Sequence, residues 1–387
     1  MCLLGVRMKF GIAAIFKNEY EYILEWIVYH QLIGVDAFYI ADNVSDDGSS
    51  QLLEALDCLG VINRVYFPRV GDCGPQMPAY NHILHRFGDE VDLLCFIDAD
   101  EFLVSTEDSE LRDLLSDFCE NDDAGALALN WRNFGSSDHK FKGEGLVIER
   151  FTRASKQDHD FNRHIKTILK PPMTKKMHIH ECVLQSGRYY SGNLQPVVFE
   201  NGEPCEPKTR KVQYEGVRVN HYVVKSRHEH VMKKECKGSG AGSATRKKGE
   251  AYFKAHDLND ESDETLLRYV NDVKSGITTL RERVIEETPY LCYGKAFVDV
   301  RSDLITGWAA AEFDGPIKIR LLINGEEHLV DVNRGRPDVV NKGLSRRLKC
   351  GFSFKPSKVI TREDRIEAYI YATTVEAKIN YRLTTTI

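Results

Sequence analysis

Two aspartates, Asp98 and Asp100, are separated by a single alanine and follow directly on the apolar run from Val91 to Ile97. In an extended segment, alternate side chains point to the same side, so both carboxylates can face one ligand. Hard divalent cations prefer oxygen ligands and complete their shell with substrate phosphates. The pair therefore predicts a Mg²⁺ or Mn²⁺ site bridging to a diphosphate, where the cation offsets the charge of the leaving group.

The segments around these aspartates predict an α/β domain. Short apolar runs, typical of buried parallel strands, alternate with segments of helical spacing such as Tyr20–Leu32 and Tyr80–Phe87. This alternation favours a mostly parallel sheet with right-handed crossovers, whose ligands bind beyond the carboxyl ends of the strands. Polar residues follow three of these ends, at 17–19, 42–43 and 98–101. The first four predicted strands are Phe10–Phe16, Ala37–Ala41, Val61–Phe67 and Val91–Ile97.

Further strands are expected in the middle and at the C-terminal end of the chain. After a helical stretch from about Glu264 to Glu286, Pro289 marks a boundary, and short β-rich runs follow it. Asn324-Gly325 between two of these runs is a strong signal for a two-residue hairpin loop. We therefore expect an α/β domain over residues 1–288 and an all-β sandwich over 289–387. The strands predicted in the middle region are Ala126–Asn130, Val147–Arg150, Lys166–Leu169 and Gly216–Val224.

The composition limits the classes of protein to which this chain can belong. The 387 residues include 52 Lys and Arg against 58 Asp and Glu, a formal net charge of −6, which argues against a nucleic-acid partner. The ten cysteines are scattered without a C-x-x-C pair, as expected for a reduced cytoplasmic protein. The N-terminus lacks the pattern of a signal peptide, and no apolar run is long enough to cross a bilayer. Any membrane role, such as at an inner membrane, would be peripheral.

Several ordered motifs carry a resemblance to known enzymes. The sequence resembles the family-2-like and family-92 glycosyltransferases of GT-A fold over roughly residues 8–270. The resemblance implies a nucleotide-diphospho-sugar transferase with a Rossmann-like mixed sheet, which transfers a sugar from a nucleotide-sugar donor, a UDP-sugar, with inversion. The motifs are residues 17–19, 25–30, 32–36, 39–43, 45–49, 76–82, 96–103, 131–136 with His139, and 220–222 with 225–226.

The resemblance also implies roles for single residues. Asp98 and Asp100 resemble the contacts to the metal and to the ribose and diphosphate, and His221 resembles a late histidine ligand of the metal. Asp42 is similar to the carboxylate that reads the nucleobase. The nucleotide-sugar site is expected to include Asn18, Glu19, Asp42, Asn43, Gln76, Asn81, Asp98 and Lys170. Exposed lysines are common, yet Lys166 and Lys170 are both candidates for neutralising the diphosphate.

The sequence does not decide which residue is the general base. An inverting transfer needs a group within hydrogen-bond reach of the acceptor hydroxyl. Asp138 and His139 follow the 131–136 motif, and Glu181 lies beside His178 and His180. We consider Asp138, His139 and Glu181 as catalytic candidates.

The sequence is also compatible with two other classes of protein. His178 and His180 share one face of a strand, which suits a metal-dependent hydrolase, and a protein of the same fold could bind carbohydrate without catalysis. The C-terminal runs resemble a β module of bacterial carbohydrate enzymes. That resemblance implies a bacterial source, synthesis of a surface polysaccharide such as lipopolysaccharide, a glycan or lipid-linked glycan acceptor, and a C-terminal domain that could mediate homo-oligomers.

Overall fold

The structure is a computed structural model. It describes residues 7–106, 111–203, 205–235, 248–287, 294–311, 317–342, 345, 348–361, 363–372, 375–378 and 384–385. The helices are α1 Tyr20–Leu32, α2 Ser49–Cys58, α3 Gln76–Phe87, α4 Leu111–Glu120, α5 Val147–Arg150, α6 Arg227–His230, α7 Glu250–His256, α8 Val270–Glu287 and α9 Pro337–Asn341. Short helical segments cover Gly88–Glu90, Asp160–Arg163, Pro171–Met173, Val231–Glu235 and Thr265–Tyr269.

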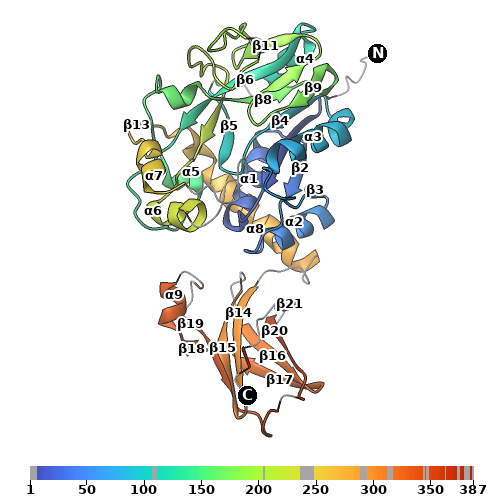
Figure 1. Cartoon of the computed structure of the whole chain (residues 1–387), viewed down its shortest axis with the longest axis vertical. Helices are drawn as coiled ribbons and strands as arrows, with labels where there is room; N and C mark the ends of the chain where they lie inside the picture. The colour runs from blue at the N-terminus through green and yellow to red at the C-terminus, as the bar shows by residue number, and fades with distance from the viewer. Residues whose placement is uncertain are drawn as a thin grey trace. The chain divides into compact units, whose positions relative to one another are not determined.

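The strands follow in chain order (Figure 1). The first part of the chain contains β1 Phe10–Phe16, β2 Ala37–Asp42, β3 Asn63–Tyr66, β4 Leu93–Phe96, β5 Glu101–Ser105, β6 Ala124–Asn133, β7 Arg153–Ala154, β8 Ile165–Leu169, β9 Thr174–Met177, β10 Cys182–Leu184, β11 Arg188–Ser191, β12 Val217–His221 and β13 Glu261–Ser262. The last part contains β14 Gly294–Arg301, β15 Leu304–Ala311, β16 Ile317–Ile323, β17 Glu326–Asp331, β18 Arg334–Gly335, β19 Lys349–Phe354, β20 Ile366–Ala372, β21 Val375–Lys378 and β22 Thr384–Thr385.

One mixed sheet organises the first part of the chain. Its order is β3-β2-β1-β4-β8-β6-β12-β5, with β11 paired to β6. The strands β3, β2, β1 and β4 are parallel, β8 runs against both β4 and β6, and β12 is parallel to β6 but antiparallel to β5. The carboxyl ends of β1, β2, β4, β6 and β12 therefore meet at one edge of the sheet. We call this edge the carboxyl edge; the antiparallel strands β5 and β8 begin there.

Apolar side chains explain why the predicted elements form. In β1 and β2 nearly every residue is buried, as expected for strands covered on both faces. In α1 every residue from Tyr22 to His30 is buried, so this helix is enclosed on all sides. Helix α3 packs Tyr80 and Ile83 into the same core as Tyr39 and Phe96 of the sheet.

The expected strand at Val147–Arg150 is wrong, because these residues form the single helical turn α5. The buried carboxylate of Glu25 accepts hydrogen bonds from the backbone N–H groups of Val147 (2.9 Å) and Ile148 (3.0 Å). A carboxylate at the start of a helical turn satisfies N–H groups that have no partner within the helix. The local apolar pattern could not reveal this partner, which lies on α1.

The C-terminal strands form two sheets, β18-β19-β15-β14-β22 and β17-β16-β20-β21. Their inner faces share one apolar cluster, with Val298 and Ile305 from the first sheet and Ile319 and Ile370 from the second. The hairpin loop at Asn324-Gly325 is confirmed: both residues have positive φ, and Ile323 pairs with Glu326. A mixed α/β sheet followed by a C-terminal β-sandwich confirms the predicted fold class.

The chain divides into two compact units, Met1–Leu53 with Gly60–Leu280 and Glu54–Leu59 with Arg281–Ile387. The boundary that we predict between residues 288 and 289 lies outside the described residues. Among the helices that the structure describes, none is both long and apolar enough to cross a membrane.

Candidate functional site

Polar side chains gather at the carboxyl edge of the mixed sheet. Asp98 follows the end of β4, and His221 is the last residue of β12. Asn133 ends β6 and pairs in register with His221. Lys166 lies at the beginning of β8, which runs antiparallel to β4. Residues far apart in the sequence thus meet at one edge, where ligands of parallel sheets bind.

Both oxygens of the Asp98 carboxylate accept hydrogen bonds from neighbouring side chains. Oδ1 accepts from Gln76 Nε2 (2.6 Å) and Tyr80 Oη (2.8 Å), and Oδ2 accepts from Lys166 Nζ (2.8 Å). Gln76 and Tyr80 are one helical turn apart at the start of α3, so both face the same way. The Asp98 side chain remains 30% exposed, so a ligand can still reach it.

Lys166 and Glu101 form the buried side of this cluster. Both side chains are fully buried, and Lys166 Nζ lies 3.3 Å from Glu101 Oε2. The same Glu101 oxygen accepts a hydrogen bond from the backbone N–H of Asp98 (2.7 Å). Among the residues that the structure describes, Glu101 Oε1 has no hydrogen-bond partner.

The cluster changes the acidity of its members. Burial by itself would raise the pKa of the Asp98 carboxyl, but the Lys166 ammonium lowers that pKa below its ordinary value. Burial raises the pKa of Glu101 to about 8, although Lys166 acts in the opposite direction. Burial would lower the pKa of Lys166, yet Asp98 and then Glu101 raise it well above its ordinary value. The cluster therefore contains a stable ammonium beside an ionised Asp98.

Asp100 faces His221 across the edge. The distance from His221 Nε2 to Asp100 Oδ1 is 3.8 Å, and both side chains are largely buried. His221 Nδ1 lies 3.1 Å from Asn133 Oδ1. The Asn133 amide is oriented by Asn162, whose Oδ1 accepts from Asn133 Nδ2 (3.0 Å). Since Asn133 presents an acceptor, Nδ1 of His221 carries a proton, and Nε2 is the ring nitrogen that faces Asp100.

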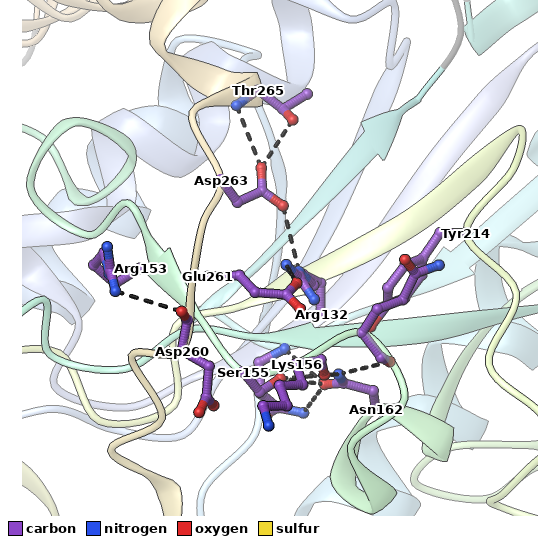
Figure 2. A network of polar contacts seen from close by, with 12 residues as sticks. Arg132, Arg153, Ser155, Lys156, Asn162, Tyr214, Asp260, Glu261, Asp263 and Thr265 are labelled. Carbon is purple, nitrogen blue, oxygen red and sulfur yellow. Dashed lines mark hydrogen bonds and ion pairs between the residues drawn. The ribbon is translucent and has the colours of Figure 1, made fainter.

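A polar network behind the edge holds Asn162 and β6 in place (Figure 2). Asn162 donates to Ser155 Oγ (2.9 Å) and to the carbonyl of Lys156 (2.8 Å), so its oxygen is fixed toward Asn133. Arg132, the neighbour of Asn133 on β6, donates to Glu261 Oε2 (2.8 Å) and lies 3.4 Å from Asp263 Oδ2. The network ties residues 261–263 to the strand that carries Asn133.

The residues at this edge fit a divalent cation in part. Asp100 and His221 offer an oxygen and an imidazole nitrogen, and the hydrogen bond from His221 to Asn133 is the outer contact that metal-bound histidines make. Within the described part of the chain, no group of three or more His, Cys, Asp or Glu side chains is arranged to hold a metal. Two protein ligands suffice for Mg²⁺ or Mn²⁺ when phosphate oxygens and water complete the shell.

Three histidine rings surround Trp131 near the carboxyl edge. The Trp131 ring lies 4.3 Å from the ring of His221, 5.2 Å from His180 and 5.0 Å from His164, measured between centroids. Trp131 Nε1 is buried without a hydrogen-bond partner among the described residues. Burial, and then the charge of Lys166, lower the pKa of His180 to about 3, so this imidazole is neutral.

The predicted nucleobase reader Asp42 is more enclosed than expected. Its buried carboxylate accepts from Arg64 Nε (3.0 Å) and Nη2 (2.8 Å), Ser50 Oγ (2.8 Å) and the Val44 N–H (3.1 Å). These four bonds occupy its acceptor positions. Asn43 is also buried, and its Oδ1 has no partner within the described ranges. Asn43 is therefore the residue of this pair with capacity left for a ligand.

Asn18 and Glu19 lie where β1 ends. Asn18 has a positive φ of 59° and accepts a hydrogen bond from the Asp46 N–H (3.0 Å). Glu19 pairs with Lys233 through Oε1, and its buried Oε2 has no partner among the residues described. Asn18 thus connects the end of β1 to the loop that follows β2.

Of three further predicted contacts, Gln76 reaches Asp98, the amide of Asn81 is engaged beside the turn that begins at His178, and Lys170 lies away from the carboxyl edge. Asn81 is engaged by the backbone of Met177, donating through Nδ2 (2.7 Å) and accepting through Oδ1 (3.0 Å). Lys170 follows the end of β8 and donates to the carbonyl of Asn121 (2.7 Å). Because β8 is antiparallel to β4, this end lies at the opposite side of the sheet. We therefore remove Lys170 from the site.

The candidate bases occupy two separate turns. Asp138 is exposed and has a positive φ of 61°. His139 Nε2 lies 3.0 Å from the carbonyl of Arg150, so this imidazole helps to hold its own loop. Glu181 Oε1 lies 2.8 Å from His178 Nδ1, and both side chains are partly exposed.

The turn from His178 to Glu181 is connected to the carboxyl edge. The Thr167 hydroxyl, next to Lys166 on β8, donates to the carbonyl of His180 (2.7 Å). His180 Nδ1 lies 3.3 Å from the carbonyl of Ile165. A carboxylate that orients an imidazole in this way is an arrangement used for general bases.

Tyr80, Asn133 and Asn162 were not predicted as contributors to the site. Tyr80 could have been found because it follows Gln76 by four residues on one helix face. Asn133 lies within the 131–136 motif at the end of a strand, where polar residues of the site are expected. No feature of the sequence connects Asn162 to this edge, since its role depends on contacts across the sheet.

Polar side chains at the carboxyl edge of a mixed α/β sheet are the arrangement expected of an enzyme, and comparison with known proteins identifies the family. The model of glycosyltransferase family 92 matches residues 9–238. The chain belongs to this family, which confirms the resemblance to family 92 stated from the sequence.

The similar curated proteins that we compared are from plants. A family 92 protein from Oryza sativa subsp. japonica is 27% identical over 195 residues, which cover 49% of this chain and 32% of that protein. A family 92 protein from Arabidopsis thaliana is 25% identical over 210 residues, covering 51% and 35%. The chain thus spans about a third of the length of these relatives.

Several solved structures align with parts of this chain. TarS from S. aureus, in complex with UDP-GlcNAc, is 18% identical with a TM-score of 0.28, covering 43% of this chain and 46% of that one. The mannosyltransferase PcManGT from Pyrobaculum calidifontis, in complex with GDP-Man and Mn²⁺, is 17% identical with a TM-score of 0.25, covering 33% and 37%.

Proposed function

We propose that this glycosyltransferase is metal-dependent and transfers a sugar from a nucleotide-sugar donor to a glycan acceptor with inversion. The observation that carries the proposal is the pair Asp100 and His221, whose Nε2 is directed at the Asp100 carboxylate by Asn133. UDP as the donor nucleotide rests on the sequence resemblance alone. When bound, Mn²⁺ or Mg²⁺ would offset the charge of the diphosphate.

The chain's own residues divide the remaining work. Asp98, held by Gln76 and Tyr80, keeps part of its carboxylate exposed toward a ligand hydroxyl. We assign the nucleoside side of the donor to Glu19 and Asn43, each of which has a buried oxygen without a partner in the described part of the chain. These orphaned acceptors are suited to the N–H and O–H donors of a nucleoside.

We assign the general base to the turn that carries His178 and Glu181. In an inverting step the acceptor hydroxyl attacks the anomeric carbon, and the bond from that carbon to the diphosphate oxygen breaks with its electron pair on the diphosphate. The hydroxyl proton passes to the base. Glu181 is joined to the carboxyl edge through the hydrogen bond from Thr167 to His180. Asp138 is the competing candidate, and His139 is engaged in holding its loop.

The test is a binding screen of UDP-, GDP-, CMP- and dTDP-sugars by calorimetry, with and without Mn²⁺. We expect one nucleotide, UDP, to bind only when Mn²⁺ is present, and the same donor to release UDP when a suitable acceptor is added. A folded protein that binds no nucleotide-sugar, but binds glycans, would instead be a carbohydrate-binding protein. Metal-dependent hydrolysis lost on changing His178 or His180 would favour the hydrolase.

The acceptor and the biological setting remain predictions. A bacterial surface polysaccharide, a lipid-linked acceptor, peripheral membrane contact and self-association through the C-terminal sandwich all come from the sequence. The plant origin of the relatives we compared gives no support to a bacterial source.

A further inference from the structure

The outer face of one C-terminal sheet carries a row of flat side chains. In the sheet β18-β19-β15-β14-β22, Phe297 on β14 pairs in register with Trp308 on β15, and Trp308 pairs with Gly351 on β19. Their neighbours along the strands, such as Val298 and Phe352, belong to the apolar cluster inside the sandwich. Because side chains alternate along a strand, Phe297 and Trp308 lie on the outer face.

Both aromatic side chains of this row are accessible to a ligand. Phe297 is 38% exposed, and Trp308 is partly exposed. The side chain of Arg336 lies over Gly351, where an added Cβ would be 2.7 Å from Arg336 Cγ. The Arg336 guanidinium is held by Asp338, to which Nε and Nη2 both donate (2.7 Å each). We call Phe297, Trp308 and Arg336 the flat row.

A second row on the same face offers hydrogen-bonding groups. It consists of Asp299, Thr306 and Ser353, which pair across the same three strands two residues along from the flat row. All three residues are partly exposed, and Asp299 Oδ2 accepts a hydrogen bond from Arg301 Nε (3.2 Å). Two residues along a strand correspond to about 7 Å. The face therefore places a carboxylate and two hydroxyls beside two aromatic rings.

The chemistry of this face favours a carbohydrate over a protein partner. A pyranose ring has faces of C–H groups, which pack on aromatic rings, and a rim of hydroxyls, which need donors and acceptors. The exposed parts of Phe297 and Trp308 amount to on the order of 100 Å², whereas a stable protein interface buries roughly 800 Å² per partner. An apolar partner laid over the polar row would also leave buried hydrogen-bonding groups unpaired.

We propose that the outer face of this sheet binds a glycan chain, with Phe297 and Trp308 packed against its sugar rings. The hydroxyls of the glycan bond to the row of Asp299, Thr306 and Ser353. This inference rests on the proposed function, since a glycan is the class of molecule to which the enzyme would transfer sugar. The face belongs to the C-terminal unit, so a glycan held there stays tethered to the enzyme between transfers.

The experiment measures how far the full chain is retarded in native gels that contain a soluble polysaccharide, without nucleotide or Mn²⁺. The gels contain hydroxyethyl cellulose, xylan, galactan or dextran, and a gel without polysaccharide is the reference. We expect at least one of these glycans to retard the wild type. Phe297→Ala and Trp308→Ala should each weaken that binding about tenfold or more, because the aromatic contacts form the centre of the site.

The matched control is Tyr369→Ala, which removes an aromatic side chain from the outer face of the other sheet of the sandwich. This control should be retarded like the wild type. Thr306→Val keeps the shape of the side chain and removes a hydroxyl of the polar row, so it should weaken binding about fivefold. It also keeps the test informative if Trp308→Ala does not fold. Circular dichroism and a thermal melt establish that each variant is folded.

Retardation by none of the four glycans, or equal retardation of Phe297→Ala, Trp308→Ala and the wild type, would overturn the inference. A wild type that is dimeric by light scattering and becomes monomeric in Phe297→Ala would also overturn it, with a second copy as the occupant. The proposed function is tested separately, because Asp100→Asn should lose sugar transfer and keep its retardation. A chain that is retarded through Phe297, but neither binds nor uses a nucleotide-sugar, would keep the glycan site and overturn the proposed function.

Discussion

Two buried ion pairs in the α/β unit, Arg150–Glu229 and Lys166–Asp98, differ in how fully their polar groups are satisfied. Glu229 accepts from Arg150 Nη1 and Nη2 (2.9 Å each), from Tyr22 Oη (2.6 Å) and from Ser226, and its side chain is nearly inaccessible. Asp98 remains partly exposed, and its neighbour Glu101 has an oxygen without a partner in the described ranges.

The difference separates a structural pair from a functional one. A closed network such as that of Glu229 adds stability and rigidity and leaves nothing for a ligand to contact. An open network, with an accessible carboxylate and an unsatisfied buried acceptor, keeps capacity that only a ligand can use. Changes at the two pairs should therefore have different effects. A change at Arg150–Glu229 should lower stability, and a change at Lys166–Asp98 should lower ligand binding or turnover.

The largest effect is expected from Asp100→Asn. If Asp100 ligates the metal, the variant should lose about a thousandfold in kcat/KM, which is about 4 kcal/mol of transition-state stabilisation. The melting temperature should stay near that of the wild type, because asparagine retains the shape of the aspartate side chain. The measurement is sugar transfer at saturating Mn²⁺. Activity within tenfold of the wild type would remove Asp100 from the metal site.

A change at the Arg150–Glu229 pair should lower the free energy of unfolding. Burial alone would raise the pKa of Glu229, but the bonds from Arg150 lower it to about 2. Because this folded-state pKa lies below the ordinary value near 4.5, the carboxylate contributes stability above about pH 4.5, and that contribution is lost as the pH falls toward 2. At pH 7, Glu229→Gln should lose about 3 kcal/mol of unfolding free energy.

The measurement for Glu229 is urea denaturation of both proteins between pH 7 and the lowest pH at which they fold. The difference in unfolding free energy should shrink as the pH falls below 4.5. The folded variant should bind Mn²⁺ like the wild type, because the closed pair does not reach the ligand. A constant difference at all pH values would show that the Glu229 charge is not the source of stability.

Glu181→Gln should sharpen the assignment of the base. Removing a general base, or the carboxylate that orients it, costs about a hundredfold or more in turnover while donor binding persists. We expect this loss in kcat for Glu181→Gln, with the nucleotide-sugar dissociation constant unchanged by calorimetry. Asp138→Asn is the matched comparison, and its turnover should stay within about twofold. The reverse pattern would move the base to the turn after β6.

Much of the fold could be predicted because apolar runs report burial directly. The strands β1, β2 and β4 lie within two residues of their predicted bounds. The Asn324-Gly325 loop has the positive φ values that its composition requires. Val147–Arg150 failed because the deciding contact, from Glu25, comes from a helix more than a hundred residues away.

The site could be predicted only where its residues follow a strand end. Asp98 and Asp100 were accessible to this reasoning, whereas His221 was expected from the family resemblance alone. The choice between Lys166 and Lys170 was not, since it depends on the direction of β8, and alternation of strands and helices had suggested a mostly parallel sheet. Lys166 lies 68 residues from Asp98, and only the antiparallel pairing of β8 with β4 brings them together.

The smallest effect on metal binding is expected from changes at Asn133. This residue orients His221 and does not itself contact the ligand. Removing the acceptor for His221 Nδ1 releases the ring, and outer contacts of this kind are worth about tenfold or more in metal affinity. We expect Asn133→Ala to weaken Mn²⁺ binding about tenfold. Asn133→Asp keeps an oxygen for the imidazole N–H but cannot donate to Asn162, so it should lose stability and keep Mn²⁺ affinity within about threefold. Equal Mn²⁺ affinity in both variants and the wild type would mean that His221 is oriented by the packing of its ring against Trp131 instead.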